Sequence, residues 1–418
     1  MLNNKILIIG LIWPEPDATA AGSRMIQLIH FFIKQGHKLS FASAASTGDL
    51  SFDFSALPVT CLNIELNSGS FDEELKSLDP GMVIFDRFLT EEQYGWRVQQ
   101  TCPDAIRILD TEDLHFLRKA REMAVKKGVD RWMEFIQNDT TKREIASIFR
   151  SDLSLIISKY EFKLLQEEFK IDTSLLFYLP FLIDIPEEKT LADLPAFDQR
   201  QHFMTIGNFK HQPNLDAIKY LHSHIWPIIR KELPQAELNI YGAYAPEAVE
   251  QLHNPATGFL IKGWIADKKE AFIQSRICLA PLRFGAGQKG KLLDSMVYGT
   301  PSVTTTIGAE GMLNTSNWNG FIENEKEAFA LKAVQLYQDQ VLWNKAQKNG
   351  YVLLQKNYDK KAYESTLVKR LESLGKDLDQ HRKSNFTGAM LSHHLHQSTK
   401  FLSKWIETKN LLNDKIVE

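Results

Sequence analysis

The N-terminal segment combines an unbroken apolar run with a periodic apolar pattern. Residues 6–9 (Ile-Leu-Ile-Ile) form a continuous run, which is typical of a parallel strand buried on both faces. Residues 39–42 (Leu-Ser-Phe-Ala) form a second such strand. Between the two strands, apolar residues recur at helical spacing at Met25, Leu28, Ile29, Phe32 and Ile33. Strand, helix and strand in this order predict a βαβ unit of a doubly wound α/β sheet.

The same alternation continues and then begins again after a break. Residues 184–200 contain two prolines and many charges with little periodicity, and we interpret them as an interdomain linker. We therefore expect two α/β domains, residues 1–183 and 201–350. Strands are expected at 59–62, 82–85, 106–109, 153–157, 203–206, 238–241, 259–261, 277–280 and 302–305, and helices at 114–149, 214–231, 246–252, 267–275, 289–298 and 324–348.

Residues 376–418 form a polar, His-rich tail. Apolar residues recur there at roughly helical spacing, at Leu391, Leu395, Leu402, Trp405, Leu412 and Ile416. This pattern favours an amphipathic helix packed on the core or on a partner, with attachment to a membrane surface as the alternative. Metal binding is a weaker interpretation, because His393, His394 and His396 do not share one helix face.

Composition narrows the class of protein. The 418 residues are 44% hydrophobic and 24% charged, which excludes a disordered or fibrous chain. A net charge of −3 gives no bulk attraction to nucleic acid. The three cysteines lie far apart without a CxxC pair, as in a reducing compartment, and the apolar run that Pro14 ends is about half as long as a membrane span requires. We expect a cytoplasmic protein.

A glycine-rich loop between a strand and a helix is the most informative motif. It contains Gly285, Ala286, Gly287, Lys289 and Lys291, and the helix that follows carries Leu292, Leu293 and Met296. Such a loop gathers backbone N–H groups and the positive end of a helix dipole, which favours an anion such as phosphate.

Other interpretations of this loop remain open. Gly285, Gly287 and Gly290 match GxGxxG, with Glu310 twenty residues later, as in dinucleotide sites, but that motif belongs in the first strand–helix turn of its domain. A P-loop would need a hydroxyl where Leu292 stands. The glycines could also serve turn geometry alone.

Residues 282–306 resemble the donor-binding segment of GT-B glycosyltransferases, specifically the retaining group 1 (family 4) type. Residues 207–242 (Gly-Asn-Phe … Ile-Tyr-Gly) are similar to the opening of the C-terminal domain of that family, and Ala21-Gly22 with Gly36-His37 is a weaker match to its N-terminal half. The resemblance implies two Rossmann-like domains across a cleft. The second would bind a nucleotide diphosphate sugar and the first an acceptor, and a helix over 351–375 would return to the first domain.

The resemblance also implies roles for individual residues. Asp294 falls where a carboxylate binds the ribose hydroxyls of the donor, and Trp264 falls where the nucleobase is contacted. The pattern departs from the family at Ala286, where a glutamate is usual, and at Asn208, Lys210 and His211, where an arginine and a lysine are usual. Lys210 and Lys291 are the candidates to supply phosphate charge.

Polar residues follow the expected strand at 106–109. Asp110, Glu112, Asp113 and His115 are candidates to orient an acceptor hydroxyl or share its proton, because strand ends in open α/β sheets point into the ligand crevice. Helix capping is the equally weighted alternative. Gly22 and Arg24, at the start of the first helix, are candidates for the cleft and for contact with phosphate or an anionic acceptor.

The residues predict a metal-independent transferase without a cofactor, since neither an HExxH motif nor a convincing DxD at a strand end is present. The acceptor would be a glycan, a lipid-linked sugar or a protein. The basic run 118–127 is interpreted as a solvated helix face, with peripheral contact at the inner face of a membrane as the alternative. An NAD(P)-dependent oxidoreductase, a nucleotide-sugar epimerase and a catalytically silent GT-B-like partner protein are the alternative functions.

Overall fold

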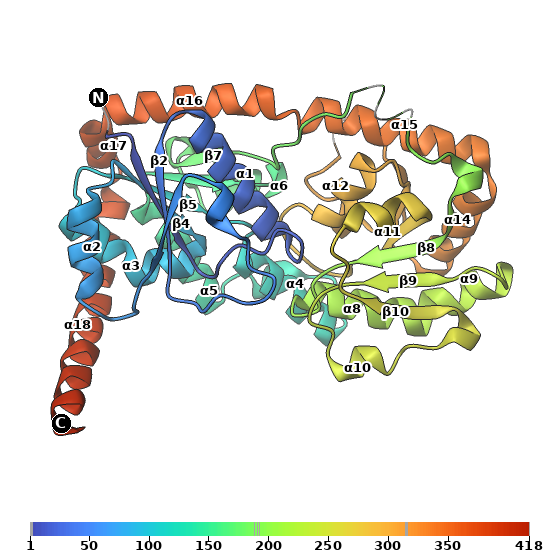
Figure 1. Ribbon diagram of the computed structural model, residues 1–418, viewed down its shortest axis with the longest axis horizontal. Helices are drawn as coiled ribbons and strands as arrows, with labels where there is room; N and C mark the ends of the chain where they lie inside the picture. Colours follow the sequence, from blue (N-terminus) through green and yellow to red (C-terminus); the bar gives the residue numbers. More distant parts are fainter. Residues whose placement is uncertain (1–2, 188, 190, 192, 314–316, 418) are drawn as a thin grey trace.

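Two α/β domains lie side by side along the long axis of the molecule (Figure 1). The computed structural model describes residues 3–417 apart from residues 188, 190, 192 and 314–316, and the side chains of residues 394–397 and 414–417 are not described.

The first domain contains a seven-stranded sheet of order β3-β2-β1-β4-β5-β6-β7, in which all neighbouring strands are parallel. Its strands are β1 (Lys5–Gly10), β2 (Lys38–Ser43), β3 (Val59–Asn63), β4 (Met82–Asp86), β5 (Ile106–Asp110), β6 (Leu153–Ile156) and β7 (Leu176–Tyr178). Its helices are α1 (Ala20–Lys34), α2 (Ser70–Leu78), α3 (Arg87–Thr101), α4 (His115–Lys127), α5 (Asp139–Arg150) and α6 (Lys159–Glu167).

The second domain repeats this arrangement with six parallel strands in the order β10-β9-β8-β11-β12-β13. Its strands are β8 (Gln201–Ile206), β9 (Leu238–Tyr241), β10 (Phe259–Gly263), β11 (Ser275–Ala280), β12 (Ser302–Thr304) and β13 (Gly320–Ile322). Its helices are α8 (Gln212–Tyr220), α9 (Trp226–Glu232), α10 (Glu247–Glu250), α11 (Lys268–Gln274), α12 (Gly290–Val297), α13 (Thr306–Ala309), α14 (Lys326–Gln338) and α15 (Gln340–Asn357).

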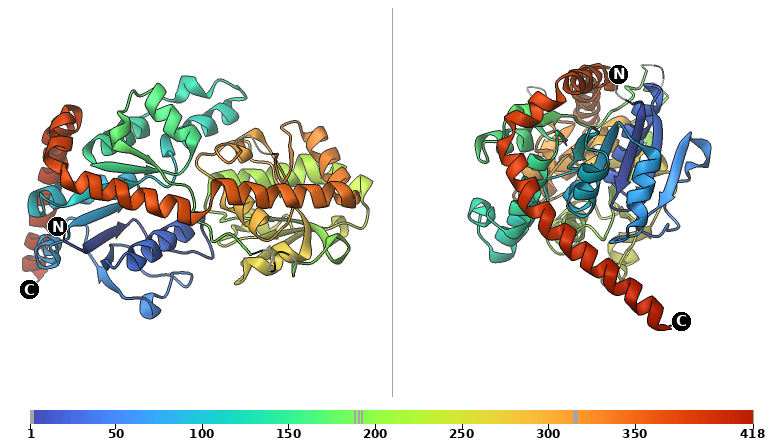
Figure 2. Two further views of the ribbon diagram at one scale, coloured as in Figure 1. Left: turned by 90° about the horizontal axis from the view of Figure 1, so that it is seen from above. Right: turned by 90° about the vertical axis from the view of Figure 1, so that its left-hand side faces the viewer.

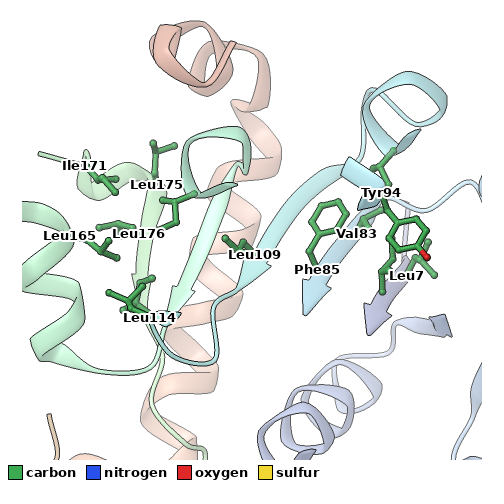
Figure 3. Close-up of a cluster of buried hydrophobic side chains, with 14 of the residues drawn as sticks. Leu7, Val83, Phe85, Tyr94, Leu109, Leu114, Leu165, Ile171, Leu175 and Leu176 are labelled. Carbon is green, nitrogen blue, oxygen red and sulfur yellow. The ribbon is translucent and has the colours of Figure 1, made fainter. Parts of the chain in front are cut away.

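Strands of the first sheet are apolar on both faces and support two cores. On one side, Leu7, Val83, Phe85 and Leu109 pack with side chains from α3 and α6 (Figure 3). On the other side, the alternate residues of the same strands pack against α1. This two-sided burial explains the unbroken apolar runs of the sequence, because each face of a parallel sheet is covered by helices.

Helix α16 (Lys360–Lys376) carries the chain from the second domain back across the first (Figure 2). Leu367, Leu371 and Leu374 are buried in the same cluster as Leu28 and Phe32 of α1. The chain then continues into α17 (Leu378–Ser384) and α18 (Phe386–Val417), which packs on α3 and α5. Both chain ends therefore lie on the first domain (Figure 1).

Several details differ from the sequence-based expectation, and three of them have a clear physical reason. The single helical region expected at 114–149 is interrupted, because Gly128 ends α4 in the left-handed conformation and Asn138 caps the start of α5. The helix expected over 351–375 is the end of α15 followed by α16, and Asp359 caps α16 by accepting a hydrogen bond from the backbone N–H of Lys361. Strands β7 and β13, with three residues each, are too short to give a periodic signal.

Candidate functional site at the interdomain cleft

Loops after the strands of both sheets meet between the domains and enclose a cavity of about 520 Å³. The first domain contributes Trp13 and Glu15, and the second contributes Lys210, Tyr244 and Trp264. The Tyr244 hydroxyl donates a hydrogen bond to Glu15 Oε1 at 2.8 Å, and the Lys210 ammonium lies 3.4 Å from the centroid of the Tyr244 ring. Two residues that the sequence singled out, Lys210 and Trp264, therefore face one cavity at the cleft.

The glycine-rich loop leaves β11 and is docked against the first domain. Gly287 has φ of 64°, and a Cβ atom at this position would lie 2.8 Å from the Cβ of Asp113. Its N–H donates to the buried carboxylate of Glu161 at 2.8 Å, while the carbonyl of Gly285 accepts from Arg121 at 2.8 Å. Arg121 also binds Glu310 of the second domain at 2.7 Å. Side chains of the first domain thus hold the loop in place.

Ala286 of this loop enters the first domain. It packs in the hydrophobic cluster of the first domain, together with Leu114 and Leu165. An alanine fits this buried position without leaving a polar group unpaired. The family that this sequence resembles usually has a glutamate here, and at this buried position a glutamate would need a partner for its charge.

Two lysines follow the glycines, Lys289 buried and Lys291 partly buried. Lys289 Nζ donates to the carbonyl of Gly287 at 2.7 Å, and Lys291 Nζ donates to Asn214 Oδ1 at 2.8 Å. Burial lowers the pKa of each ammonium to about 8. An anion placed beside them would favour their charged forms, so the pair is suited to bind one.

The N-termini of two helices approach each other at this point. Gly290 begins α12, and a Cβ atom there would lie 2.8 Å from the Cβ of Ala20, the first residue of α1. The first N–H groups of a helix have no acceptor within the helix, and its N-terminus carries partial positive charge. The N-termini of α1 and α12 therefore supply partial positive charge in addition to the charge of Lys291.

Asp294 lies one turn further along α12 and forms an ion pair with Lys268 of α11 at 2.9 Å. Burial raises the pKa of this carboxyl group, although its side chain keeps 23% of its exposure. A partly exposed carboxylate of this kind can accept hydrogen bonds from a ligand that enters the cleft.

The acidic residues after β5 separate into two groups. Asp113 pairs with Arg118 and lies 3.3 Å from His115 Nε2, next to Gly287. Burial would raise the pKa of Asp113, but Arg118 and His115 lower it to about 2. Burial lowers the pKa of His115 to about 3, so Asp113 is charged and His115 neutral at pH 7. These two predicted residues thus lie beside the glycine-rich loop.

Asp110 lies in the interior instead. Both of its oxygens accept hydrogen bonds from Arg24, at 2.9–3.1 Å, and Arg24 also donates to the carbonyl of Leu179 at 2.8 Å. Both side chains are almost completely buried. In this arrangement they hold the first domain together and neither reaches the cleft. Gly22 packs against the backbone of Glu15, where a Cβ atom would lie 2.4 Å away.

Comparison with known proteins agrees with this geometry. Residues 200–339 match the family model described as glycosyl transferases group 1. A relative described as an uncharacterized 44.6 kDa protein in the cps region of Klebsiella pneumoniae is 23% identical over 299 residues, which cover 68% of this chain and 74% of the relative.

Solved structures show the same fold. Sucrose-phosphate synthase from Thermosynechococcus elongatus superimposes with a TM-score of 0.65 and 15% identity, covering 88% of this chain and 98% of its own. A TarM mutant from S. aureus, in complex with fondaparinux, alpha-GlcNAc-glycerol and UDP, gives a TM-score of 0.55 and 15% identity. That match covers 73% of this chain and 58% of the longer TarM chain. The chain has the GT-B fold, and its residues 200–339 are similar to group 1 glycosyltransferases.

The GT-B fold class and the group 1 resemblance predicted from the sequence are thus confirmed. In this GT-B protein the glycine-rich loop follows β11, the fourth strand of its sheet along the chain, and not the first strand as in a dinucleotide site. Among the described residues, no helix has the length and apolar character needed to cross a membrane.

Sequence reasoning missed two residues that contact the glycine-rich loop. Glu161 and Arg121 contact the loop from more than a hundred residues away, and no local pattern links them to it. Glu112, which the sequence did single out, lies just after β5. The structure places it in the left-handed region, with φ of 62°, and burial, together with Asp110 and Asp86, raises its pKa well above the ordinary value.

Proposed function

We propose that the protein transfers a sugar from a nucleotide diphosphate sugar to an acceptor hydroxyl, with retention of configuration as its resemblance implies. The observation that carries the proposal is the positive site at the start of α12, where buried Lys289 and partly buried Lys291 lie beside the N-termini of α1 and α12. Such a site favours a diphosphate, and the matched TarM structure contains UDP.

These residues would assist the departure of the diphosphate leaving group. When the glycosidic bond breaks, negative charge grows on the departing diphosphate. Lys291 and the N–H groups of α12 are already fixed near it, so they stabilise that charge without reorganising. Lys210 would add charge from the neighbouring loop.

The remaining site residues would bind the two ends of the donor and the acceptor. Asp294 would accept hydrogen bonds from the ribose hydroxyls, and Trp264 would contact the nucleobase. Asp113 and His115, on the opposite side of Gly287, would orient the acceptor hydroxyl. Neutral His115 can accept the hydroxyl proton, although its low pKa makes it a weak base.

The first test is binding of the nucleotide. We expect UDP to bind Asp294→Asn about 10- to 100-fold more weakly than the wild type, because hydrogen bonds to a charged group contribute about 1.5–3 kcal/mol. Isothermal titration calorimetry measures the dissociation constant of UDP. Glu270→Gln, at an exposed position of α11, is the control. If neither UDP nor the GDP, ADP and CMP analogues bind the wild type, the protein is the silent partner protein instead.

The second test concerns metal ions. We expect transfer to be unchanged by EDTA, because the lysines and backbone N–H groups can supply the positive charge that the diphosphate needs. Product formation is measured with and without the chelator, followed by addition of Mg²⁺ or Mn²⁺. A rate that falls with EDTA and returns with either ion would contradict metal independence while leaving glycosyl transfer in place.

A further inference from the structure

Several small residues of the C-terminal helix α18 face the protein, and several of its large apolar residues face solvent. Gly388 packs against the carbonyl of Phe149 in α5, and Ser403 accepts a hydrogen bond from Arg97 of α3. Ser392 is also buried, and these three positions share one face of the helix. A helix that served only to complete a core would place its large apolar side chains on this inner face.

The outer face carries five large apolar side chains at helical spacings of four, seven and eleven residues. Phe401 and Trp405 are 64% and 61% exposed, and the other residues of this outer stripe are between 46% and 77% exposed. The outer stripe consists of Phe386, Met390, Phe401, Trp405 and Leu412. Figure 2 shows the last turns of α18 extending past the first domain, so the protein itself leaves this part of the stripe uncovered.

Charges along the last described turns are distributed asymmetrically. Lys400 and Lys409 lie on either side of the outer stripe, and the Lys409 ammonium is 5.4 Å from the centroid of the Trp405 ring. Glu407 faces the other way, and a Cβ atom at Gly69 near α2 would lie 2.5 Å from its carboxylate. Lys404 contacts Asp72 and Glu407 on that side. The solvent-facing charge beside the stripe is therefore positive.

Two occupants of the stripe can be distinguished on this basis. Pairing with a second copy would bring lysines opposite lysines, and Ser398 and Thr408 interrupt the 3–4 apolar spacing that a coiled-coil seam requires. An anionic lipid surface attracts the lysines and accepts the apolar side chains between them, and tryptophan is favoured at that interface.

We propose that the outer stripe of α18 binds the surface of an anionic lipid bilayer and holds the first domain against it. The helix would lie in the interface with Phe401, Trp405 and Leu412 buried among the lipids, while Lys400 and Lys409 contact the headgroups. The helix does not cross the bilayer. This assignment does not depend on the proposed catalytic activity, and its test requires no turnover.

The test is co-sedimentation of the full chain with phosphatidylglycerol–phosphatidylcholine vesicles and with pure phosphatidylcholine vesicles. We expect binding to the anionic vesicles only, lost at high salt because lysines beside a surface are screened. The double variant Phe401→Ser, Trp405→Ser should bind at least about tenfold more weakly, since two large apolar side chains no longer enter the lipid. Val341→Ser, at an exposed apolar position of α15 in the second domain, is the matched control and should bind normally.

Three results would overturn the proposal. The first is a wild type that stays in solution with both kinds of vesicle. The second is a double variant that binds as well as Val341→Ser. The third is light scattering that shows a dimer in the wild type and a monomer in the double variant, which would make a second copy the occupant. Circular dichroism of each variant establishes that it is folded.

Discussion

Replacing Lys291 by alanine is expected to lower kcat for glycosyl transfer by about 10²–10³-fold. The ammonium is partly buried and already fixed by Asn214 at 2.8 Å, so it can stabilise the growing charge of the diphosphate without moving. The rate is measured with saturating donor and acceptor. Lys269→Ala, at an exposed lysine of α11, is the matched control and should leave kcat unchanged.

The pH dependence offers an independent measurement of the same group. Because the pKa of Lys291 is lowered to about 8, the ammonium is charged below that pH and loses its charge as pH rises through it. UDP should therefore bind more weakly above pH 8, and binding there should take up protons from the buffer. Lys291→Ala should reduce this proton uptake by about half, since the pKa of Lys289 is also about 8. Unchanged uptake in the variant would exclude Lys291 from the diphosphate site.

Replacing Arg24 by alanine is expected to lower the free energy of unfolding by about 3–5 kcal/mol, because it leaves the carboxylate of Asp110 buried without its partner. The carbonyl of Leu179 would lose a donor as well. Urea unfolding followed by circular dichroism measures the change. The double variant Arg24→Met, Asp110→Leu should recover much of the loss, since it removes both charges together.

An exposed pair provides the control for this experiment. Arg143 binds Glu92 at the surface of the first domain, and Arg143→Ala should cost less than about 1 kcal/mol. If Arg24→Ala unfolds at the same urea concentration as the wild type but has lost transfer activity, then Arg24 and Asp110 act on the substrate, as the sequence suggested. The burial of the pair favours the structural result.

The fold was predictable because its signals are local. A parallel strand covered on both faces, such as residues 6–9, requires an unbroken apolar run, and α1 requires an apolar stripe at helical spacing. The glycine-rich loop was found for the same reason, since a tight turn before a helix needs glycines close together in the sequence. Boundaries failed where one side chain decides them, as at the cap formed by Asp359.

The candidate site was less predictable because its contacts are distant in sequence. The sequence places Asp110 and Asp113 in one cluster after β5, and only tertiary structure sends Asp110 to Arg24 and Asp113 to Gly287. The carboxylate of Glu161 accepts a hydrogen bond from the glycine-rich loop, although the two lie 126 residues apart in the sequence and in different domains. The contacts of Glu161 and Asp113 with the loop depend on how the two domains meet, and the spacing of hydrophobic residues does not encode this.

The return of α16 to the first domain affects how the chain reaches its native state. Leu367, Leu371 and Leu374 complete a core whose other members are encoded before residue 183. During synthesis, the first domain must wait for a segment translated after the whole second domain has emerged from the ribosome. A nascent chain that ends at α15 would therefore expose part of the apolar surface of α1, and this surface is covered only when translation is nearly finished.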